Sequence, residues 1–206
     1  MKFSNAPICF LFYGALISIG IATYIGKINY YSLYFNKDLI FKKHEYWRLF
    51  SSLFLFKPGR FGNWVASLTC LNRLYYIESS FFIKRPADFL LFMLYIFCFC
   101  WLIGYLTPIT DFLDLISFSI IYYYSRKSPG AFMIFLFIFS SYYLPFIFII
   151  ISDDYYSRIS ILALTIAMHM YFFLHDVIYL KYDIPFFKLP DVLNQLLHNI
   201  FAIVPF

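Results

Sequence analysis

Apolar residues in this chain gather into runs of membrane-spanning length, and polar residues collect between the runs. About 20 helical residues cross the hydrocarbon layer of a bilayer, which is roughly 30 Å thick. Because the runs leave room only for short connections, we predict an all-α polytopic membrane protein with six transmembrane helices. The predicted spans are residues 8–26, 61–82, 87–106, 109–124, 131–151 and 157–180, followed by a short tail at 181–206 that shows no obvious folded domain. The first span is longer than the apolar core of a signal peptide, which has about 7–15 residues, so we expect a retained helix.

Two of these spans are poorly suited to lipid on their own. In residues 61–82, eight Leu, Ile, Val and Phe residues contribute about −4 kcal/mol on an insertion scale, while the central Arg73 costs about +3 kcal/mol. Residues 109–124 would form a helix only about 24 Å long. Both helices therefore need neighbours in a bundle. A polar stripe that includes Asn63, Ser67 and Glu78 is expected to face inward.

The long connection at residues 27–60 mixes lysine and arginine with tyrosine, tryptophan and phenylalanine. Aromatic rings and long basic side chains both favour the headgroup level, so we predict an interfacial first loop. Trp47 and Arg48 have two interpretations there. In one, Trp47 anchors at the interface while Arg48 reaches lipid phosphates. In the other, Arg48 is buried and braces the irregular backbone by bonding its carbonyl groups.

Composition excludes a soluble domain and a nucleic-acid binder. Apolar residues make up 63% of the chain and charged residues 13%, with a mean hydropathy of +0.75, whereas soluble domains are about half apolar and about a quarter charged. The net charge of +5 is spread over the ends of apolar runs, where it sets orientation. If both termini are cytosolic and the interfacial loop is left out, only Arg158 lies on the opposite side. The cytosolic basic residues are then Lys2, Lys84, Arg85, Arg126, Lys127, Lys181 and Lys188.

One catalytic arrangement is conceivable, a serine protease within the membrane that pairs Ser117 or Ser119 with His169. Such an enzyme needs backbone donors for an oxyanion hole, usually made with glycines beside the nucleophile. The seven glycines lie elsewhere, at positions 14, 20, 26, 59, 62, 104 and 130. We therefore expect ordinary helix hydroxyls and no enzyme activity.

No cofactor or metal site is expected either. His169 and His175 fall on different helix faces, and the cysteines at 9, 70, 98 and 100 lie inside apolar runs. On the last span Thr165, His169 and Asp176 share a stripe within about 40°. That stripe is either the wall of a wetted cavity or an ordinary interhelical hydrogen-bonding face. The substrate-groove hypothesis combines the two stripes: Asn63, Ser67, Glu78, Thr165, His169 and Asp176.

The order of short motifs resembles the Derlin family, the non-catalytic relatives of rhomboid intramembrane proteases. The resemblance covers about residues 41–177 and combines several pieces that are weak alone. These are EYWRLFSSLFLF in the first loop, LNRLYYIESSFFIKRPADF at 71–89, YYSRKSP at 123–129, Met133, YLP at 143–145 and HMYFFLHDV at 169–177. Their order and spacing across the predicted helices make the combined match specific.

This resemblance implies a rhomboid-like fold in the endoplasmic reticulum membrane and a role in disposing of misfolded proteins. Derlins assist the passage of such clients to the cytosol beside a membrane ubiquitin ligase and an AAA unfoldase. Oligomers with a second copy or with another rhomboid-like protein are also expected. The chain departs from the family where the GxxxG glycines of the last span would fall, at Leu164 and Met168, although Ala163 and Ala167 form a small-residue stripe. The tail lacks the unfoldase-recruiting box of some Derlins, so a partner would have to recruit the unfoldase.

The expected mechanism breaks no covalent bond. A polar client segment pays several kcal/mol at the bilayer centre, and wetting or thinning the bilayer lowers that cost. Short and polar helices favour both effects. The alternatives are an active rhomboid-type serine protease and, with less support, a small-molecule carrier, which would usually show two related halves with broken helices.

Overall fold

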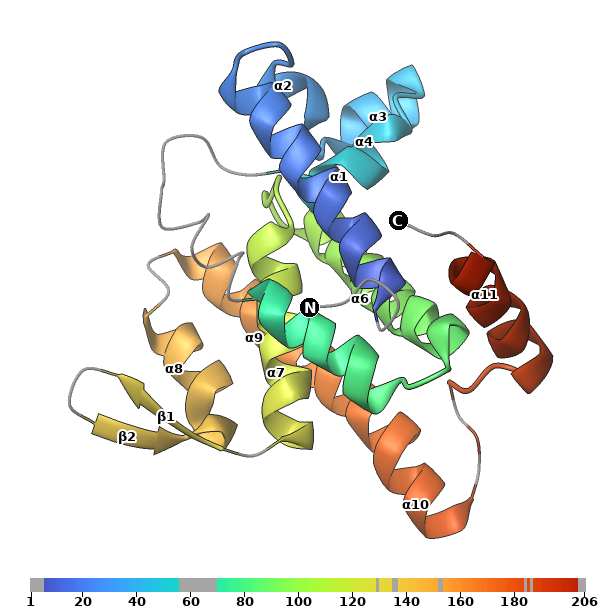
Figure 1. Ribbon diagram of the computed structural model, residues 1–206. Helices are drawn as coiled ribbons and strands as arrows, with labels where there is room; N and C mark the ends of the chain where they lie inside the picture. The colour runs from blue at the N-terminus through green and yellow to red at the C-terminus, as the bar shows by residue number, and fades with distance from the viewer. Residues whose placement is uncertain are drawn as a thin grey trace.

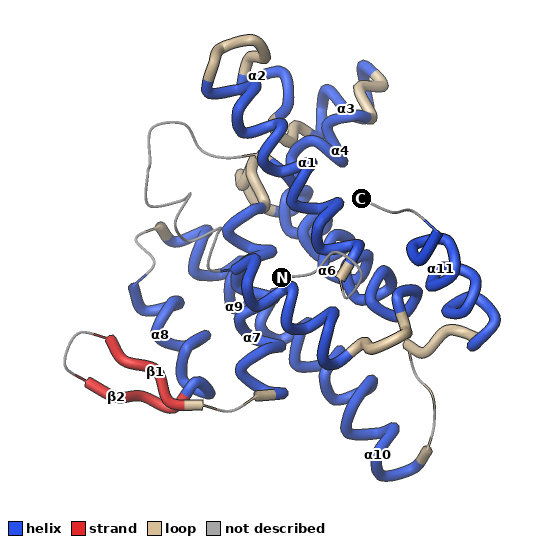
Figure 2. The backbone as a smooth tube through the Cα atoms, viewed as in Figure 1, coloured by secondary structure: helices blue, strands red, loops and turns tan. Residues whose placement is uncertain are grey.

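The computed structural model describes residues 6–55, 70–128, 130–134, 137–151, 154–183, 185 and 187–203. The described chain is nearly all helical, as Figures 1 and 2 show. The elements before residue 110 are α1 (Pro7–Tyr24), α2 (Tyr30–Leu33), α3 (Lys37–Lys43), α4 (Trp47–Ser51), the 3-10 turn η2 (Ser52–Phe54), a helix at 70–76, the π-helical turn η3 (Ile77–Phe81) and α6 (Pro86–Leu106). The later elements are α7 (Leu113–Lys127), β1 (Ala131–Ile134), β2 (Phe137–Ser140), the 3-10 turn η4 (Ser141–Tyr143), α8 (Leu144–Ile151), α9 (Tyr155–Phe172), the π-helical turn η5 (Phe173–Val177), α10 (Ile178–Tyr182) and α11 (Asp191–Ile203).

Three helical segments of the described chain are long and apolar enough to cross a membrane. They are α1, α6 and the continuous run Tyr155–Tyr182, which contains α9, η5 and α10. Local sequence sets their ends. Pro7 and Pro86 open α1 and α6, where a missing N–H costs nothing, and the Asp154 carboxylate caps α9 by accepting from the Ser157 amide at 3.2 Å. The count of six spans remains a prediction.

The region of the predicted fifth span differs from a single helix. Residues Ala131–Ile134 and Phe137–Ser140 form an antiparallel hairpin, with Ala131 opposite Ser140. Among the described residues of this region, Leu144–Ile151 form the α-helix α8. A short run of Phe, Ile and Met satisfies strand and helix patterns alike, and aromatic and β-branched residues favour the strand. Pro145 lies in the first turn of α8, where the helix tolerates it.

The core forms where α6, α7 and α9 pack together, and it is rich in aromatic rings. Tyr123 of α7 is central to it, with its ring 4.8 Å from that of Phe92 and 5.9 Å from that of Tyr171, and all three side chains are buried. Phe82 and Phe89 extend this cluster toward the start of α6. The aromatic contacts bring helices from distant parts of the sequence into one body.

The predicted tail is more ordered than its three prolines suggested. A 13-residue helix, α11, follows Pro190 and packs against α6. Figure 1 shows this helix in red at the edge of the bundle, beside α6. The tail therefore belongs to the same folded body as the spans.

Candidate functional site

The most polar buried region lies between α7 and the end of α9, and we call it the α7–α9 polar cluster. Its centre is Asp176 of η5, which is buried. The Asp176 carboxylate lies 2.5 Å from Lys127 Nζ, accepts a hydrogen bond from Tyr123 Oη at 3.1 Å and lies 3.2 Å from His175 Nδ1. One carboxylate thus joins two residues of α7 to its own neighbour on η5. An ionic group in this position is satisfied by protein partners.

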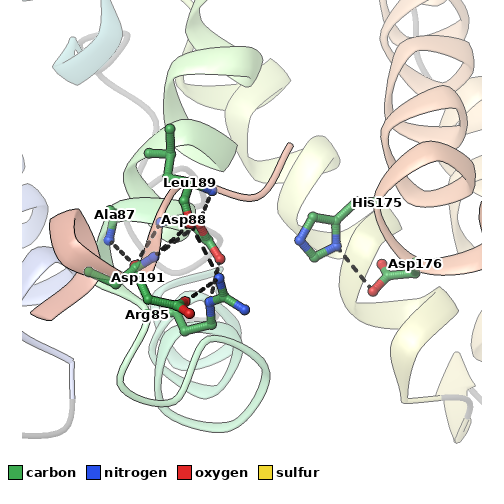
Figure 3. A network of polar contacts seen from close by, with 8 residues as sticks. Arg85, Ala87, Asp88, His175, Asp176, Leu189 and Asp191 are labelled. Atoms are coloured by element: carbon green, nitrogen blue, oxygen red, sulfur yellow. Dashed lines mark hydrogen bonds and ion pairs between the residues drawn. The ribbon is translucent and has the colours of Figure 1, made fainter. Parts of the chain in front are cut away.

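The ring of His175 stacks on Tyr171, with 5.3 Å between centroids and 10° between planes. Figure 3 shows the His175 imidazole directed at Asp176 through one nitrogen. Within the described chain, His175 Nε2 and Tyr171 Oη have no hydrogen-bond partner. The cluster therefore has more polar atoms than internal partners, as expected where water or a polar segment reaches a bundle.

His169 lies apart from this cluster, on the surface of α9. Its Nδ1 lies 2.8 Å from the hydroxyl of Tyr122, which also accepts a hydrogen bond from Arg126 Nε at 3.2 Å. The Arg126 guanidinium lies over the rings of Tyr122 and Tyr142, 5.2 and 5.4 Å from their centroids. His169 is exposed, Arg126 is half-buried and Tyr122 is buried, so these residues form a polar edge that runs inward from the surface of α9 beside the buried cluster. Thr165, one turn before His169, is half-buried and donates to the carbonyl of Ile161.

The single stripe predicted for Thr165, His169 and Asp176 is split in the structure. The cause is the π-helical turn η5, which the amide of Ile178 closes on the carbonyl of Phe173, five residues earlier. A π turn adds a residue and shifts the following side chains by up to about 100°. Asp176 consequently faces the bundle, while His169 faces outward.

Glu78, the other buried carboxylate of the predicted groove, caps a helix. It lies on η3 and accepts hydrogen bonds from the backbone amides of Ile8 and Cys9, at 3.0 and 2.7 Å. These amides have no partner within α1, and the positive end of the helix dipole favours the carboxylate. Glu78 therefore fixes α1 to η3 across 70 residues of sequence. Asn63 and Ser67 lie outside the described residues.

The two serines considered as nucleophiles, and expected to be ordinary helix hydroxyls, have local partners. Ser119 is buried and its hydroxyl donates to the carbonyl of Leu115, one turn earlier, at 2.9 Å. Ser117 is half-buried and hydrogen-bonds Cys70. His169 contacts Tyr122 rather than either serine.

In the first loop Arg48 is buried and Trp47 is exposed. Arg48 Nη1 donates to the carbonyls of Tyr31 and Tyr34 at 3.0 and 3.1 Å, and its Nε lies 2.6 Å from Glu45. This is the geometry of the bracing interpretation. Ser51 adds a hydrogen bond to the carbonyl of Leu33 at 2.7 Å.

Tyr30, in the same loop, shows how tightly the loop is packed. Burial and the nearby Asp111 carboxylate raise the pKa of its phenol to about 12. Side chains that bond its backbone hold the loop around α2 and α4.

A further polar network ties α11 to the start of α6, and the sequence analysis missed it. Asn194 accepts from the amides of Ala87 and Asp88 at 3.0 and 3.4 Å, and Asp88 accepts from the Leu189 amide at 2.8 Å. Figure 3 shows Arg85 reaching Asp191 in the same group of contacts. The available signal was an acidic residue in the first turn after a helix-opening proline, a position that interacts well with the helix N-terminus.

Comparison with known proteins places these features in a family. The model of the Der1-like family matches residues 7–190, which includes all the predicted spans and the buried carboxylates Glu78 and Asp176. A probable derlin-2 homolog of Dictyostelium discoideum is 28% identical over 215 residues, covering 95% of this chain and 81% of the relative. Derlin-2.2 of Arabidopsis thaliana is 27% identical over 167 residues, covering 73% of this chain and 67% of the relative. The chain belongs to the Der1-like family and is a multi-pass membrane protein.

Proposed function

We propose that the chain is a non-catalytic component of endoplasmic-reticulum-associated degradation that assists retrotranslocation of misfolded proteins to the cytosol. Membership of the Der1-like family, whose members work in this process, supports the role. The proposal places the protein in the endoplasmic reticulum membrane with both termini in the cytosol. Its partners would be misfolded clients, a membrane ubiquitin ligase complex, an AAA unfoldase recruited indirectly and a second rhomboid-like subunit.

The observation that carries the mechanism is the difference in helix length across the bundle. Helix α6 has 21 residues and α1 has 18, so they are about 32 and 27 Å long. Helix α7 has 15 residues and α8 has eight, so they reach only about 22 and 12 Å. A hydrophobic layer of about 30 Å must thin to match the second pair.

The groove would lie on this short side of the bundle. The polar edge of His169, Arg126 and Tyr122, which reaches the surface at His169, would supply the polar wall that a client meets, with Thr165 beside it. Glu78 and Asp176 would act one layer deeper, because both are buried and hold helices together. Asn63 and Ser67 stay in the proposal as groove residues on the second predicted span.

Each part of this arrangement lowers the same free-energy cost. A charged client residue at the bilayer centre costs about 3 kcal/mol on insertion scales. A thinner, wetter layer reduces the thickness of hydrocarbon that this residue must cross. Trp47 at the surface and Arg48 within the first loop would set the depth of that loop beside the groove. No covalent step is required.

The test is a density map of the purified protein in a lipid nanodisc. We expect the headgroup layers to approach each other beside α7 and α8 and to keep normal separation beside α1 and α6. Equal thickness on both sides would remove the mechanism. Degradation of misfolded secretory proteins at an undiminished rate in cells that lack the gene would remove the role itself.

The protease alternative makes a separate prediction. A fluorophosphonate probe labels a serine only when a base activates it, and Ser119 donates to a backbone carbonyl instead. We expect no labelling at Ser117 or Ser119. Labelling that disappears in the His169→Ala variant would instead support an intramembrane protease.

A further inference from the structure

Helix α11 is amphipathic, and only one of its faces is covered by the protein. Asn194, Leu197 and Phe201 recur at the spacing of one helix face; Asn194 is buried, and the other two are half-buried. A second face, about 100° away, carries Leu193, Leu196 and Ile200, which are 46–53% exposed. The remaining arc carries the polar residues Asp191, Gln195, His198 and Asn199, and the exposed Val192 lies at its boundary with the second face.

The position of α11 relative to the membrane is fixed by α6. Asn194 caps the first turn of α6 through the Ala87 and Asp88 amides, and Asp88 in turn accepts from Leu189. Helix α6 is one of the segments able to cross a membrane, and Leu90 and Leu94 in its first turns are exposed. The first residues of such a helix lie at the boundary between headgroups and hydrocarbon. Whatever is clamped to them lies at that boundary too.

We propose that α11 is an interfacial helix that lies along the membrane surface and buries Leu193, Leu196 and Ile200 in the outer part of the lipid layer. Its three arcs match three environments: the protein, the lipid and water. A helix of this kind typically inserts its apolar face a few ångströms below the headgroups. The inference depends on the membrane embedding of α6 and not on the proposed role in degradation.

We expect lipid, rather than a protein partner, to cover the exposed face because of where α11 is held. The Asn194 and Asp88 contacts, called the clamp below, keep it at the membrane boundary. At the level of the α6 N-terminus the surroundings of the bundle are lipid, and the clamp keeps α11 there without a separate association step. Helix α11 contains no lysine or arginine, so anionic headgroups are not the attraction. We therefore expect insertion into a neutral phosphatidylcholine bilayer, driven by apolar burial alone.

The Asp88–Asn194 contacts also give α11 a role in the fold. They link the start of the α6 span to the chain that follows α10, so the first residues of one span and the exit from another are held together. Arg85 reinforces the link, with its Nε 2.7 Å from Asp88 and its Nη2 3.2 Å from Asp191. An interfacial helix tied at this point would fix the depth in the membrane of the start of α6 and of the end of α10.

The test uses spin labels on the full chain in phosphatidylcholine nanodiscs. The native cysteines at 9, 70, 98 and 100 are replaced by alanine, and single cysteines are introduced as L193C, L196C, I200C, Q195C or N199C. Collision with oxygen reports lipid, and collision with a water-soluble nickel chelate reports water. We expect oxygen to dominate at L193C, L196C and I200C and the chelate to dominate at Q195C and N199C, with no change when anionic lipid is added.

Two results would overturn the proposal. Chelate access at L196C equal to that at Q195C would place the apolar face in water. Protection of L196C from both reagents would mean that a protein, such as a second copy of the chain, covers it. As a check on the clamp, the N194A variant should lose hydrogen-exchange protection at the Ala87 and Asp88 amides and should blur the oxygen and chelate pattern along α11. Retention of the full pattern in N194A would overturn the role of the clamp in setting depth.

Discussion

Helices α6 and α7 follow one another in the chain and pack together, but they are held in different ways. Helix α6 is a 21-residue helix whose buried residues are mostly apolar, including Phe92, Ile96 and Cys100. Helix α7 has 15 residues and buries Ser119, Tyr123 and Ser125 beside its aliphatic residues. The first can be stable in lipid through its own apolar surface. The second depends on partners on α9 and η5, and it is also the helix too short for the bilayer.

The difference between α6 and α7 can be tested most directly by measuring the membrane insertion of each helix outside the fold. When each segment is placed in a host protein and its insertion is scored by glycosylation, we expect Pro86–Leu106 to insert almost completely. Leu113–Lys127 should insert in only a small fraction of molecules, because its length and its charged ends work against it. Efficient insertion of Leu113–Lys127 would contradict the view that α7 depends on its neighbours.

Removing the central partner of α7 should have the next largest effect. The D176A variant leaves the Lys127 ammonium and the Tyr123 hydroxyl without their buried acceptor, which should cost about 3–5 kcal/mol of unfolding free energy. The measurement is denaturation in mild detergent. The matched control is D38A, which breaks the exposed Asp38–Lys42 pair at 2.8 Å and should leave stability unchanged.

The Asp38–Lys42 pair also shows why the control is a fair one. Hydrogen bonding to Lys42 lowers the pKa of the Asp38 carboxyl and, reciprocally, raises the pKa of the Lys42 ammonium. The interaction is therefore real but lies in water. If D176A and D38A were equally stable, burial would not distinguish the two pairs and the contrast between α6 and α7 would lose its energetic basis.

A third test concerns the contact between the two helices. A Cβ added at Gly104 of α6 would lie 2.4 Å from Cζ of Phe112, the residue just before α7. We expect G104A to destabilise the protein by about 1–3 kcal/mol through overpacking. Gly14 of α1 has nothing within 4 Å of the same position, so G14A should cost little or nothing in the same thermal unfolding assay. Equal effects would indicate that the two helices are not closely packed at this point.

The smallest effect should come from the polar edge of His169, Arg126 and Tyr122. The Y122F variant removes the hydroxyl that meets both His169 and Arg126, and interhelical hydrogen bonds of this kind average about 0.6 kcal/mol in membranes. Y142F, which keeps the ring beneath Arg126, serves as the control. A small loss in melting temperature for Y122F alone is expected, and a loss as large as that of D176A would mean that this edge is structural.

The sequence predicted the long helices well because their signals are local. Helices α1 and α6 and the segment Tyr155–Tyr182 begin and end within a few residues of long, mainly apolar runs closed by proline, glycine or aspartate. The hairpin at Ala131–Ser140 was not predicted because a short apolar run fits both the strand period and the helix period. Its length and apolar character do not distinguish a strand from a helix, and the packing of the run determines which one forms.

The candidate site was predicted less well because its contacts are remote in sequence. Glu78 was correctly assigned to the bundle interior, but its bonds to the amides of Ile8 and Cys9 span 70 and 69 residues. Asp88 and Asn194 are 106 residues apart and were not considered. A helical-wheel projection placed Asp176 beside His169 because it assumes a constant 100° per residue, and η5 departs from that value.

The wide turn at η5 makes the geometry of this segment as important as its composition. Deleting one residue of the turn ahead of Asp176 would convert it to ordinary α-helix, and the side chains of α10 would keep their present direction, because the π turn already offsets them by one residue. Converting the turn to α-helix with all its residues retained would instead rotate Asp176 away from Lys127 and turn α10 by about a quarter of a revolution. A substitution that favours α geometry here would therefore do more harm than the loss of a single codon.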